Sequence, residues 1–221
     1  MTGVQTCALP ILPGYINVDK VDEEAYGAEK RRVDVNTDLF DLKLKPESVD
    51  EIRLHHVFEH FHRYQAVVLM FYWNNWLKVG GSLVIETPNF YQCAKNYVLY
   101  SLLGDRLRMY KTLRHVFGSK EADWASHLEG WDKRTLSDFY KTYGFLISDV
   151  VESSGPLAIV RVTGFKNKSL TTQDFPRLSR KFLSRYVVNA FEIDIWMKKA
   201  TELFNKINNN TLSKITKIKN D

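Results

Sequence analysis

Residues 48–61 read SVDEIRLHHVFEHF, and the change of character within this stretch decides the fold class. Its first half predicts a buried strand, because apolar side chains recur at Val49, Ile52, Leu54 and Val57. The strand ends in His55 and His56, and His60 and His62 follow, so four of the six histidines of the chain lie here. Ionisable side chains at a strand end are typical of an open α/β sheet, which binds ligands outside the carboxyl ends of its strands.

The composition is that of a globular protein with one main domain. The chain has 221 residues, of which 44% are hydrophobic and 13% aromatic, enough to bury a sizeable core. No apolar run approaches the roughly 20 residues of a membrane span, and Met1–Leu12 lacks the pattern of a secretory signal. Two cysteines, Cys7 and Cys93, are too few for a disulfide framework, so we expect a cytoplasmic protein.

The positive charge is concentrated at the C-terminal end of the chain. Residues 166–221 carry 12 Lys/Arg against 5 Asp/Glu, which leaves 19 against 21 in residues 1–165. The net charge of +5 therefore belongs to the C-terminal part, and the preceding core is slightly acidic. We expect this basic part to dock on a partner or a membrane surface, and we find no recognisable nucleic-acid motif.

The order of strand and helix signals predicts a parallel sheet. Leu12–Asp19 predicts a Pro-Gly turn and a short strand, and Arg32–Asp38 predicts a second strand. Tyr64–Lys78 has helical periodicity and is expected to end at Gly80-Gly81, before a strand over Ser82–Glu86. Strand, helix and strand in this order indicate a βαβ unit.

The second half of the chain predicts further helices and a hairpin. The expected elements are a helix over Phe90–Tyr110, a loop over Lys111–Trp131, a helix over Asp132–Tyr143 capped by Asp132, and strands over Leu146–Glu152 and Leu157–Val162 that pair antiparallel. Lys166–Arg177 is polar and predicts a linker. Leu178–Ile207 predicts one long amphipathic helix, followed by a frayed tail.

Four motifs, taken in order, resemble one family of enzymes. They are PGYINVD (13–19), VDVNTDL (33–39), SVDEIRLHHVFEHF (48–61) and WLKVGGSLVIETPN (76–89). Together they resemble the class I S-adenosylmethionine-dependent methyltransferases, and the type 11 group looks nearest, although Val79 stands where that group has proline. HVFGSKEADWASHLEGWDKRTLSDFYKTYGF (115–145) is similar to the closing segment of that group.

The resemblance covers Leu12 to about Thr163 and implies an organisation for the whole chain. It implies an α/β, Rossmann-like methyltransferase core over residues 12–165, followed by a basic linker and amphipathic helix over residues 166–221. Residues 1–11, MTGVQTCALPI, resemble a translated sequencing adapter, which would make them non-native. They stand where the family has its first strand and a glycine-rich loop, so we expect both to be missing from a truncated enzyme. The alternative is an ordinary N-terminus in which VQTCALPIL forms a short strand.

Residues after the second and third strands are candidates for binding S-adenosylmethionine. A carboxylate at Asp19 can accept hydrogen bonds from both ribose hydroxyls, as in dinucleotide-binding folds, or it can serve as a turn or cap residue. The resemblance implies that Asp38 holds the adenine amino group and that Leu39 covers the ring face. Asp34 and Asp41 are close rivals of Asp38 in the sequence.

The histidines after the fourth strand would border the methyl-transfer position. We expect His55 to contact the cofactor and His56 to act as a general base, because an ordinary histidine pKa suits proton removal near neutrality. The alternative for both is a satisfied polar residue at a strand end. Glu59 is expected to brace the loop. His56 and His60 have a chelating i, i+4 spacing, but HVFEH lacks the glutamate of the zinc-protease pattern HExxH, so we predict no metal.

The segment before the last predicted helix would cover the acceptor. His115, His127 and Trp131 are candidates for selecting the substrate, or they pack the loop. The resemblance implies methyl transfer by in-line attack that depends mainly on positioning, and this truncated form could be inactive. The slightly acidic core favours a small-molecule or glycan acceptor over nucleic acid. The alternative function is that of a non-catalytic Rossmann-like binding domain that no longer binds the cofactor.

Overall fold

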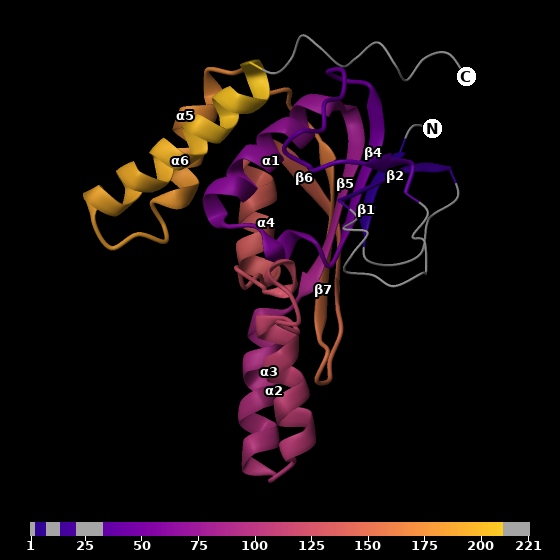
Figure 1. Ribbon diagram of the computed structural model, residues 1–221, viewed down its shortest axis with the longest axis vertical. Coiled ribbons are helices and arrows are strands. Elements are labelled where there is room, and N and C mark those ends of the chain that lie inside the picture. Colours follow the sequence, from indigo (N-terminus) through magenta and orange to yellow (C-terminus); the bar gives the residue numbers. More distant parts are fainter. Residues whose placement is uncertain (1–2, 8–13, 21–32, 210–221) are drawn as a thin grey trace.

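The computed structural model describes residues 3–7, 14–20 and 33–209, and a seven-stranded mixed sheet forms its centre (Figure 1). The strands are β1 (Gly3–Cys7), β2 (Tyr15–Asp19), β3 (Val35–Asn36), β4 (Val49–His55), β5 (Leu77–Pro88), β6 (Phe145–Glu152) and β7 (Ile159–Lys166). Their spatial order is β3-β2-β1-β4-β5-β7-β6. The first five pair in parallel, whereas β7 runs antiparallel to both β5 and β6. The parallel sheet and the antiparallel hairpin predicted from the sequence are therefore confirmed.

Helices cover one side of this sheet in two layers, and two further helices project away from it (Figure 1). They are α1 (Arg63–Trp76), α2 (Phe90–Leu102), α3 (Arg106–Phe117), α4 (Lys133–Thr142), α5 (Asp174–Leu183) and α6 (Ala190–Asn209), with short 3-10 turns η1 (Phe58–His60) and η2 (Asp123–Ala125). Helices α1 and α4 pack on the sheet, and α5 and α6 pack on α1. Helices α2 and α3 form the projecting hairpin.

Helix α1 is the centre of the hydrophobic core. Ten of its 14 residues are buried, because the sheet lies on one side of it and α5 and α6 lie on the other. A helix that is apolar all round is expected to be buried in this way. Phe71 of α1 meets the rings of Phe175 and Phe204, which stack on each other with centroids 4.0 Å apart. The C-terminal helices thus complete the core.

The opposite face of the sheet carries polar side chains from β2, β4 and β5. The Glu51 carboxylate accepts hydrogen bonds from the Tyr15 hydroxyl, from Arg53 Nε at 2.9 Å and from Ser82 Oγ at 2.7 Å. The pKa of Glu51 is lowered, since these hydrogen bonds outweigh the effect of burial. Strands that are covered on both faces are usually continuous apolar runs. Here β4 alternates ionisable and apolar side chains from Glu51 to His55, which fits a sheet that is packed mainly on one face.

The position expected to be empty at the centre of the sheet is filled. Gly3–Cys7 form β1, which pairs with both β2 and β4, as in the alternative in which this stretch is an ordinary strand. The pairing does not bear on where residues 1–11 come from. The family's glycine-rich loop would follow β1, and residues 8–13 lie outside the described residues.

The first predicted helix ends earlier than its glycines suggested. Helix α1 stops at Trp76 and β5 begins at Leu77, so the expected end at Gly80-Gly81 is wrong. Leu77 is fully buried and pairs with Val49, which draws the chain into the sheet at once. Gly80 instead has a φ of +81° inside the strand, a conformation that favours glycine.

Each of two segments that were predicted to form one helix forms two helices in the structure. Residues 90–110 break at Gly104, which has a φ of +70°, and the next residue, Asp105, caps α3 by accepting a hydrogen bond from Arg108 N at 3.1 Å. Helix α3 then continues to Phe117, into the expected loop. Residues 178–207 likewise break before Asn189, whose side chain accepts from Glu192 N at 2.9 Å. In both places a helix-capping side chain competes with continued helix.

The remaining boundaries differ less from the predictions. The expected strand over Arg32–Asp38 shortens to β3, and the expected linker over Lys166–Arg177 holds the end of β7 and the start of α5. Helix α4 begins as predicted, because the Asp132 carboxylate accepts from Thr135 N at 2.8 Å. The frayed tail predicted after Ile207 falls mostly on residues 210–221, outside the described residues.

Candidate functional site

The strand order reverses between β1 and β4, and this is where an open α/β sheet binds its ligands. The parallel strands all end at the same edge of the sheet. The register places His55 of β4 next to Cys7 of β1 on one side and next to Glu86 of β5 on the other. Asp19 ends β2 at the same edge. The structure therefore brings the predicted Asp19 and His55 to one sheet edge.

The Asp38 side chain lies close to the end of β2. Its Oδ2 is 3.5 Å from Nζ of Lys20, and Lys20 N donates to Asp19 Oδ1 at 2.8 Å. Asp38 Oδ1 also accepts from the backbone N of Phe40 at 3.0 Å, which fixes the turn after β3. Leu39 is half-buried and packs against the core.

The two rivals of Asp38 are engaged elsewhere. Asp34 Oδ2 accepts from Asn17 N at 2.8 Å and from Asn17 Nδ2 at 2.9 Å, and so braces β2. Asp41 lies 3.4 Å from Nζ of Lys206 in α6. These contacts favour Asp38 as the acidic residue that faces the ligand edge.

The two histidines after β4 share a network of carboxylates. His55 Nδ1 lies 3.3 Å from Oε1 of Glu86, and this hydrogen bond lowers the pKa of Glu86. His56 has a φ of +51°, and its Nδ1 lies 3.2 Å from Oε1 of Glu59. The hydrogen bond to Glu59 raises the pKa of His56 against the opposing effect of burial.

Glu59 is the buried centre of the cluster. Its side chain is 1% exposed, and burial alone would raise its pKa, but the hydrogen bond and charge of His56 hold the pKa low. His127 Nε2 lies 4.0 Å from Glu59 Oε1, and the backbone O of Glu59 accepts from Leu128 N at 2.8 Å. Glu59 thus ties the end of β4 to the segment before α4, which agrees with the bracing role expected from the sequence.

The predicted substrate-side residues divide into two groups. His115 and His127 border the Glu59 cluster, because the His115 ring centroid lies 5.9 Å from that of His56 and the His127 ring lies 4.8 Å from that of His60. Burial lowers the pKa of both His115 and His127.

Trp131 lies apart from these histidines. It is 1% exposed, and its ring stacks on Phe58 and Phe139 at centroid distances of 5.0 and 5.4 Å. Such burial supports the packing alternative for Trp131. Its indole N–H, like Glu59 Oε2, has no hydrogen-bond partner within the described part of the chain.

Comparisons with known proteins support the fold. No protein-family model matches the chain, and no curated protein matches its sequence. Among solved structures, the chain is similar to one determined as the complex of the Haloferax volcanii Trm112 methyltransferase activator with a protein designated a methyltransferase. That match has 10% identity and a TM-score of 0.51, and covers 77% of this chain and 83% of the other.

Two further similar structures have lower scores. One is Burkholderia thailandensis 1,6-didemethyltoxoflavin-N1-methyltransferase, bound to 1,6-didemethyltoxoflavin and S-adenosylhomocysteine, with 13% identity, a TM-score of 0.45, 70% of this chain covered and 61% of that chain. The other is a SAM-dependent methyltransferase from Aquifex aeolicus, with 11% identity, a TM-score of 0.42, and coverages of 75% and 82%.

The strand order and the likeness to the Haloferax structure define the fold. It is the Rossmann-like fold of class I S-adenosylmethionine-dependent methyltransferases, as the sequence motifs implied. Within the described residues, no helix is both long enough and apolar enough to cross a membrane.

The residues present fit one half of S-adenosylmethionine better than the other. The carboxylates of Asp19 and Asp38 stand at successive strand ends beside the half-buried Leu39, which suits a ribose and an adenine ring. The methionine half needs a close backbone approach that glycine allows. Residues 8–14, which connect β1 to β2, read ALPILPG, and their one glycine, Gly14, stands directly before β2 and not directly after β1. The fit is therefore to the adenosine half.

Proposed function

We propose that the protein is an S-adenosylmethionine-dependent methyltransferase acting on a small-molecule or glycan acceptor. The observation that carries the proposal is the convergence of Asp19, Asp38 and His55 at the sheet edge where the strand order reverses. When bound, the cofactor supplies an electrophilic methyl group. The slightly acidic core makes a nucleic-acid acceptor the less favoured choice.

The residues of the edge would have distinct tasks. Asp19 would accept hydrogen bonds from the ribose hydroxyls, Asp38 would hold the adenine amino group, and Leu39 would cover the ring. His55, held by Glu86, would contact the cofactor from the end of β4. Catalysis would depend mainly on holding the reacting atoms in line and keeping water out.

His56 is the candidate base. Its Nδ1 faces the buried Glu59 carboxylate, which orients the ring, and its Nε2, 3.8 Å from Glu86 Oε1, is the nitrogen that would take a proton from an acceptor. A histidine held by a carboxylate is a common arrangement for a general base. The acceptor would approach from the side of residues 91–131, where His115 and His127 border the cluster.

Calorimetry with S-adenosylhomocysteine tests the cofactor site. The chain should be measured as it stands and with residues 1–11 replaced by the segment encoded upstream of Leu12. Asp19→Asn should weaken binding about tenfold to a hundredfold in whichever form binds, because it removes charge-assisted hydrogen bonds. Asp138→Asn, an exposed carboxylate on α4, is the matched control and should leave the affinity unchanged. Binding by neither form would sink the proposal.

A non-catalytic binding domain is the second candidate, favoured by one observation. Only residues 8–14 connect β1 to β2, fewer than the dozen or more that a parallel crossover with a helix needs. A chain that keeps the sheet without the glycine loop would lose the methionine contacts first. If restoring the upstream segment fails to produce binding, this candidate is preferred.

A further inference from the structure

Glu59, His60 and His127 converge beneath the end of β4, outside the proposed cofactor contacts. One ligand atom from each residue lies within 4.8 Å of the other two. Glu59 and His60 come from η1, whereas His127 comes from the segment between η2 and α4. The fold therefore brings together a carboxylate and two imidazoles from positions 67 residues apart in the sequence.

The hydrogen bonds around this cluster leave metal-binding lone pairs free. His60 Nδ1 lies 3.0 Å from the carbonyl O of Ser126, so Nδ1 carries the proton and Nε2 keeps its lone pair. Glu59 Oε1 accepts from His56, while Oε2 has no partner among the described residues although the side chain is 1% exposed. Ligand histidines in metalloproteins typically donate their other ring N–H to a backbone carbonyl in this way.

A buried carboxylate oxygen without a donor calls for an explanation, because leaving it unsatisfied is costly. His127 Nδ1 is a second buried atom without a partner in the described part of the chain. A cation bound by His127 Nε2, which faces Glu59, would satisfy the Glu59 carboxylate, and His127 Nδ1 on the other side of the ring would keep its proton and point away from the ion. Two imidazoles and one carboxylate form a ligand set that zinc takes in catalytic sites, with a fourth position open to water.

We propose that Glu59, His60 and His127 bind a divalent transition metal ion, with zinc as the expected occupant. Zinc bonds of about 2.0–2.2 Å in a tetrahedral site put ligand atoms about 3.4 Å apart, so the three side chains must close by about 1.4 Å at their widest separation. His56 stays outside the site and orients Glu59 through the 3.2 Å hydrogen bond. The sequence pointed away from a metal because HVFEH lacks the glutamate of the HExxH pattern, and it did not connect His127 with this stretch.

Metal titration of the full chain tests the site independently of methyl transfer. The chain is stripped with a chelator and titrated with Zn²⁺ against a chromophoric competitor, and with Co²⁺ followed by visible absorption. We expect one equivalent of zinc and the intense cobalt absorption of a four-coordinate site. His60→Ala and His127→Ala should each weaken zinc binding at least tenfold.

Controls separate this site from general histidine binding and from misfolding. His62→Asn alters a histidine outside the cluster at the start of α1, where asparagine is also a good cap, and should leave zinc affinity unchanged. Circular dichroism checks that the variants fold. Equal zinc affinity in wild type and in the two alanine variants overturns the proposal. A wild-type cobalt spectrum of the weak, octahedral aquo type overturns it whatever the variants do.

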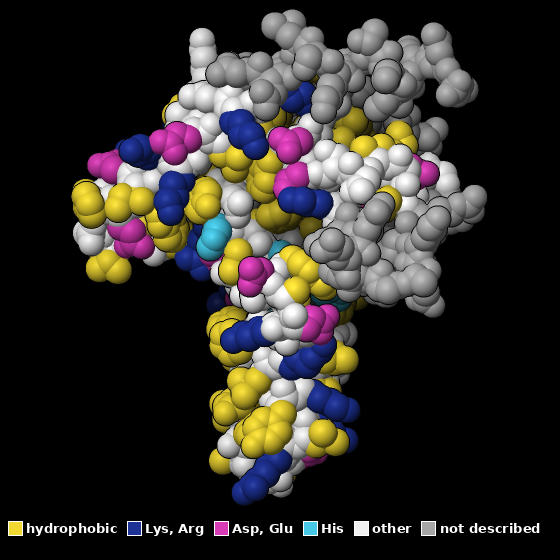
Figure 2. Space-filling view, viewed as in Figure 1, with side chains coloured by type: hydrophobic (Ala, Val, Ile, Leu, Met, Phe, Trp, Pro, Cys, Tyr) yellow, Lys and Arg dark blue, Asp and Glu magenta, His cyan; other side chains and the backbone are white. Residues whose placement is uncertain are grey.

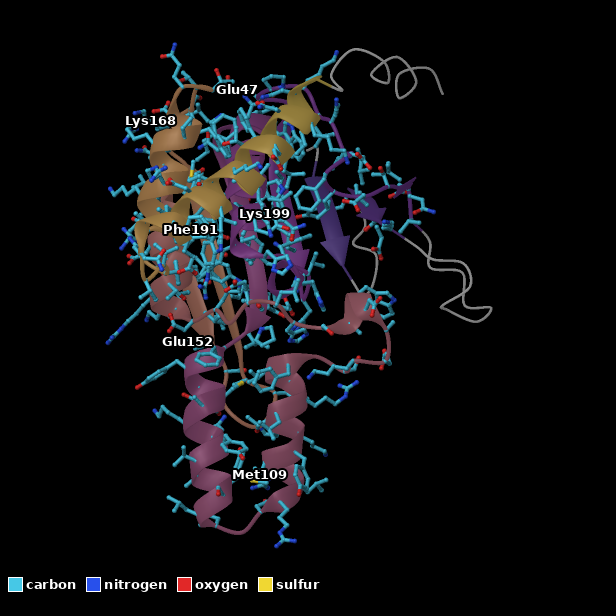
Figure 3. The ribbon with its side chains drawn as sticks, turned by 60° about the vertical axis from the view of Figure 1, so that its left-hand side comes forward. Glu47, Met109, Glu152, Lys168, Phe191 and Lys199 are labelled. Carbon is cyan, nitrogen blue, oxygen red and sulfur yellow. The ribbon has the colours of Figure 1, made fainter. Side chains whose placement is uncertain are left out.

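The projecting α2–α3 hairpin carries a second, independent inference. Its apolar side chains are exposed along both helices, and Figure 2 shows them interleaved with Lys and Arg. At its end, Leu102, Leu103 and Leu107 are 82%, 69% and 66% exposed. In Figure 3, Met109 lies out on this hairpin, while Glu152 lies where the hairpin meets the body. Large exposed apolar patches mark interaction surfaces.

Charge decides which occupant the hairpin fits. Residues 90–117 carry five Lys/Arg, namely Lys95, Arg106, Arg108, Lys111 and Arg114, against the single acidic residue Asp105. A second copy of the same hairpin would bring like charges together. An anionic lipid surface instead matches both features, because leucines enter the acyl boundary while basic side chains remain at the headgroups.

We propose that the hairpin end docks on anionic membrane surfaces. The docking on a partner or a membrane surface that the sequence placed on the C-terminal part stays a separate prediction, and the apolar side of α6 packs on α1. In vesicle sedimentation, the full chain should bind vesicles containing phosphatidylserine at least tenfold more strongly than phosphatidylcholine vesicles, and salt should weaken this binding. Leu102→Ser with Leu103→Ser should abolish it.

A matched exposed residue controls for the loss of apolar surface. Val188→Ser, between α5 and α6, removes a side chain that is 93% exposed and should leave vesicle binding unchanged. Equal sedimentation of wild type and of the double serine variant overturns the proposal. A concentration-dependent dimer that the double variant dissolves, without vesicle binding by wild type, overturns it in favour of a second copy.

Discussion

Asn74 offers a sharp test of how the core is held together. It lies in α1 with 0% exposure, and its Nδ2 donates to the carbonyl O of Tyr143 at 2.9 Å and to that of Lys168 at 2.8 Å. Its Oδ1 accepts from Leu170 N at 3.0 Å. One side chain thus joins α1 to the end of α4 and to the chain that leads into α5.

The cost of Asn74→Ala follows from what it leaves unpaired. Tyr143 and Leu170 are buried, so their carbonyl and N–H lose their partners without access to water, at about 1–3 kcal/mol each. Lys168 is exposed, and its carbonyl can turn to solvent at little cost. We therefore expect a loss of about 4 kcal/mol in the free energy of unfolding, a large part of the stability of a typical domain.

Urea unfolding of Asn74→Ala and of Asn75→Ala measures this loss in the free energy of unfolding. Asn75 is the next residue of α1 and only half-buried, so its substitution should change the free energy of unfolding by less than about 1 kcal/mol. The two slopes against urea should agree with that of wild type, since a changed slope would signal a different denatured or native ensemble. A loss below about 1 kcal/mol for Asn74→Ala at unchanged slope would refute the reasoning.

Three further outcomes follow from single side chains. Lys166 is 1% exposed, and its Nζ donates to Leu77 O at 2.8 Å and to Glu47 Oε1 at 3.1 Å. In urea unfolding, Glu47→Ala should therefore lower the free energy of unfolding more than Lys166→Met does, because only Glu47→Ala leaves the buried charge of Lys166 without its carboxylate. Burial raises the pKa of Cys93 to about 11, so mass spectrometry should find its thiol alkylated only after unfolding, and rapid alkylation of the native protein would contradict this. Hydrogen bonds from the Thr171 backbone and then from Arg177 lower the pKa of Asp174 from 3.8 to about 2, so its stabilising contribution is present above pH 3.8 and is lost as the pH falls through about 2. In Asp174→Asn, the free energy of unfolding should fall less between pH 3.8 and about 2 than it does in wild type. An equal fall in the two proteins would count against this role of Asp174.

The sequence predicted those features that depend on neighbouring residues. The strand ending at Asp19, the cap at Asp132 and the antiparallel hairpin all follow from local periodicity and capping. The break at Gly104-Asp105 also has a local sequence signal, a glycine followed by a capping aspartate, but helical periodicity on both sides of it favoured one continuous helix.

The Glu59 cluster could not be predicted in this way. His127 reaches Glu59 only because the segment before α4 folds back onto η1, where Leu128 N donates to the backbone O of Glu59. The local spacing of residues cannot predict a contact between two residues that lie 68 positions apart in the sequence. The histidine pair that the sequence did offer, His56 and His60, is divided in the structure, because His56 braces Glu59 while the His60 ring lies beside that of His127, with centroids 4.8 Å apart.

The central strand shows why fold and cofactor binding separate in this chain. A parallel strand needs only a short extended segment between two others, and Gly3–Cys7 supplies that for β2 and β4 whatever its origin. On the proposed function, cofactor binding would need more, namely a turn after β1 that lets the backbone approach the methionine half. Among the residues with described burial, the core centres on α1, which packs between the sheet and the C-terminal helices. The described sheet and helices therefore pack around α1, and on the proposed function the few residues that precede β2 would decide whether the edge at Asp19 and Asp38 binds the whole cofactor.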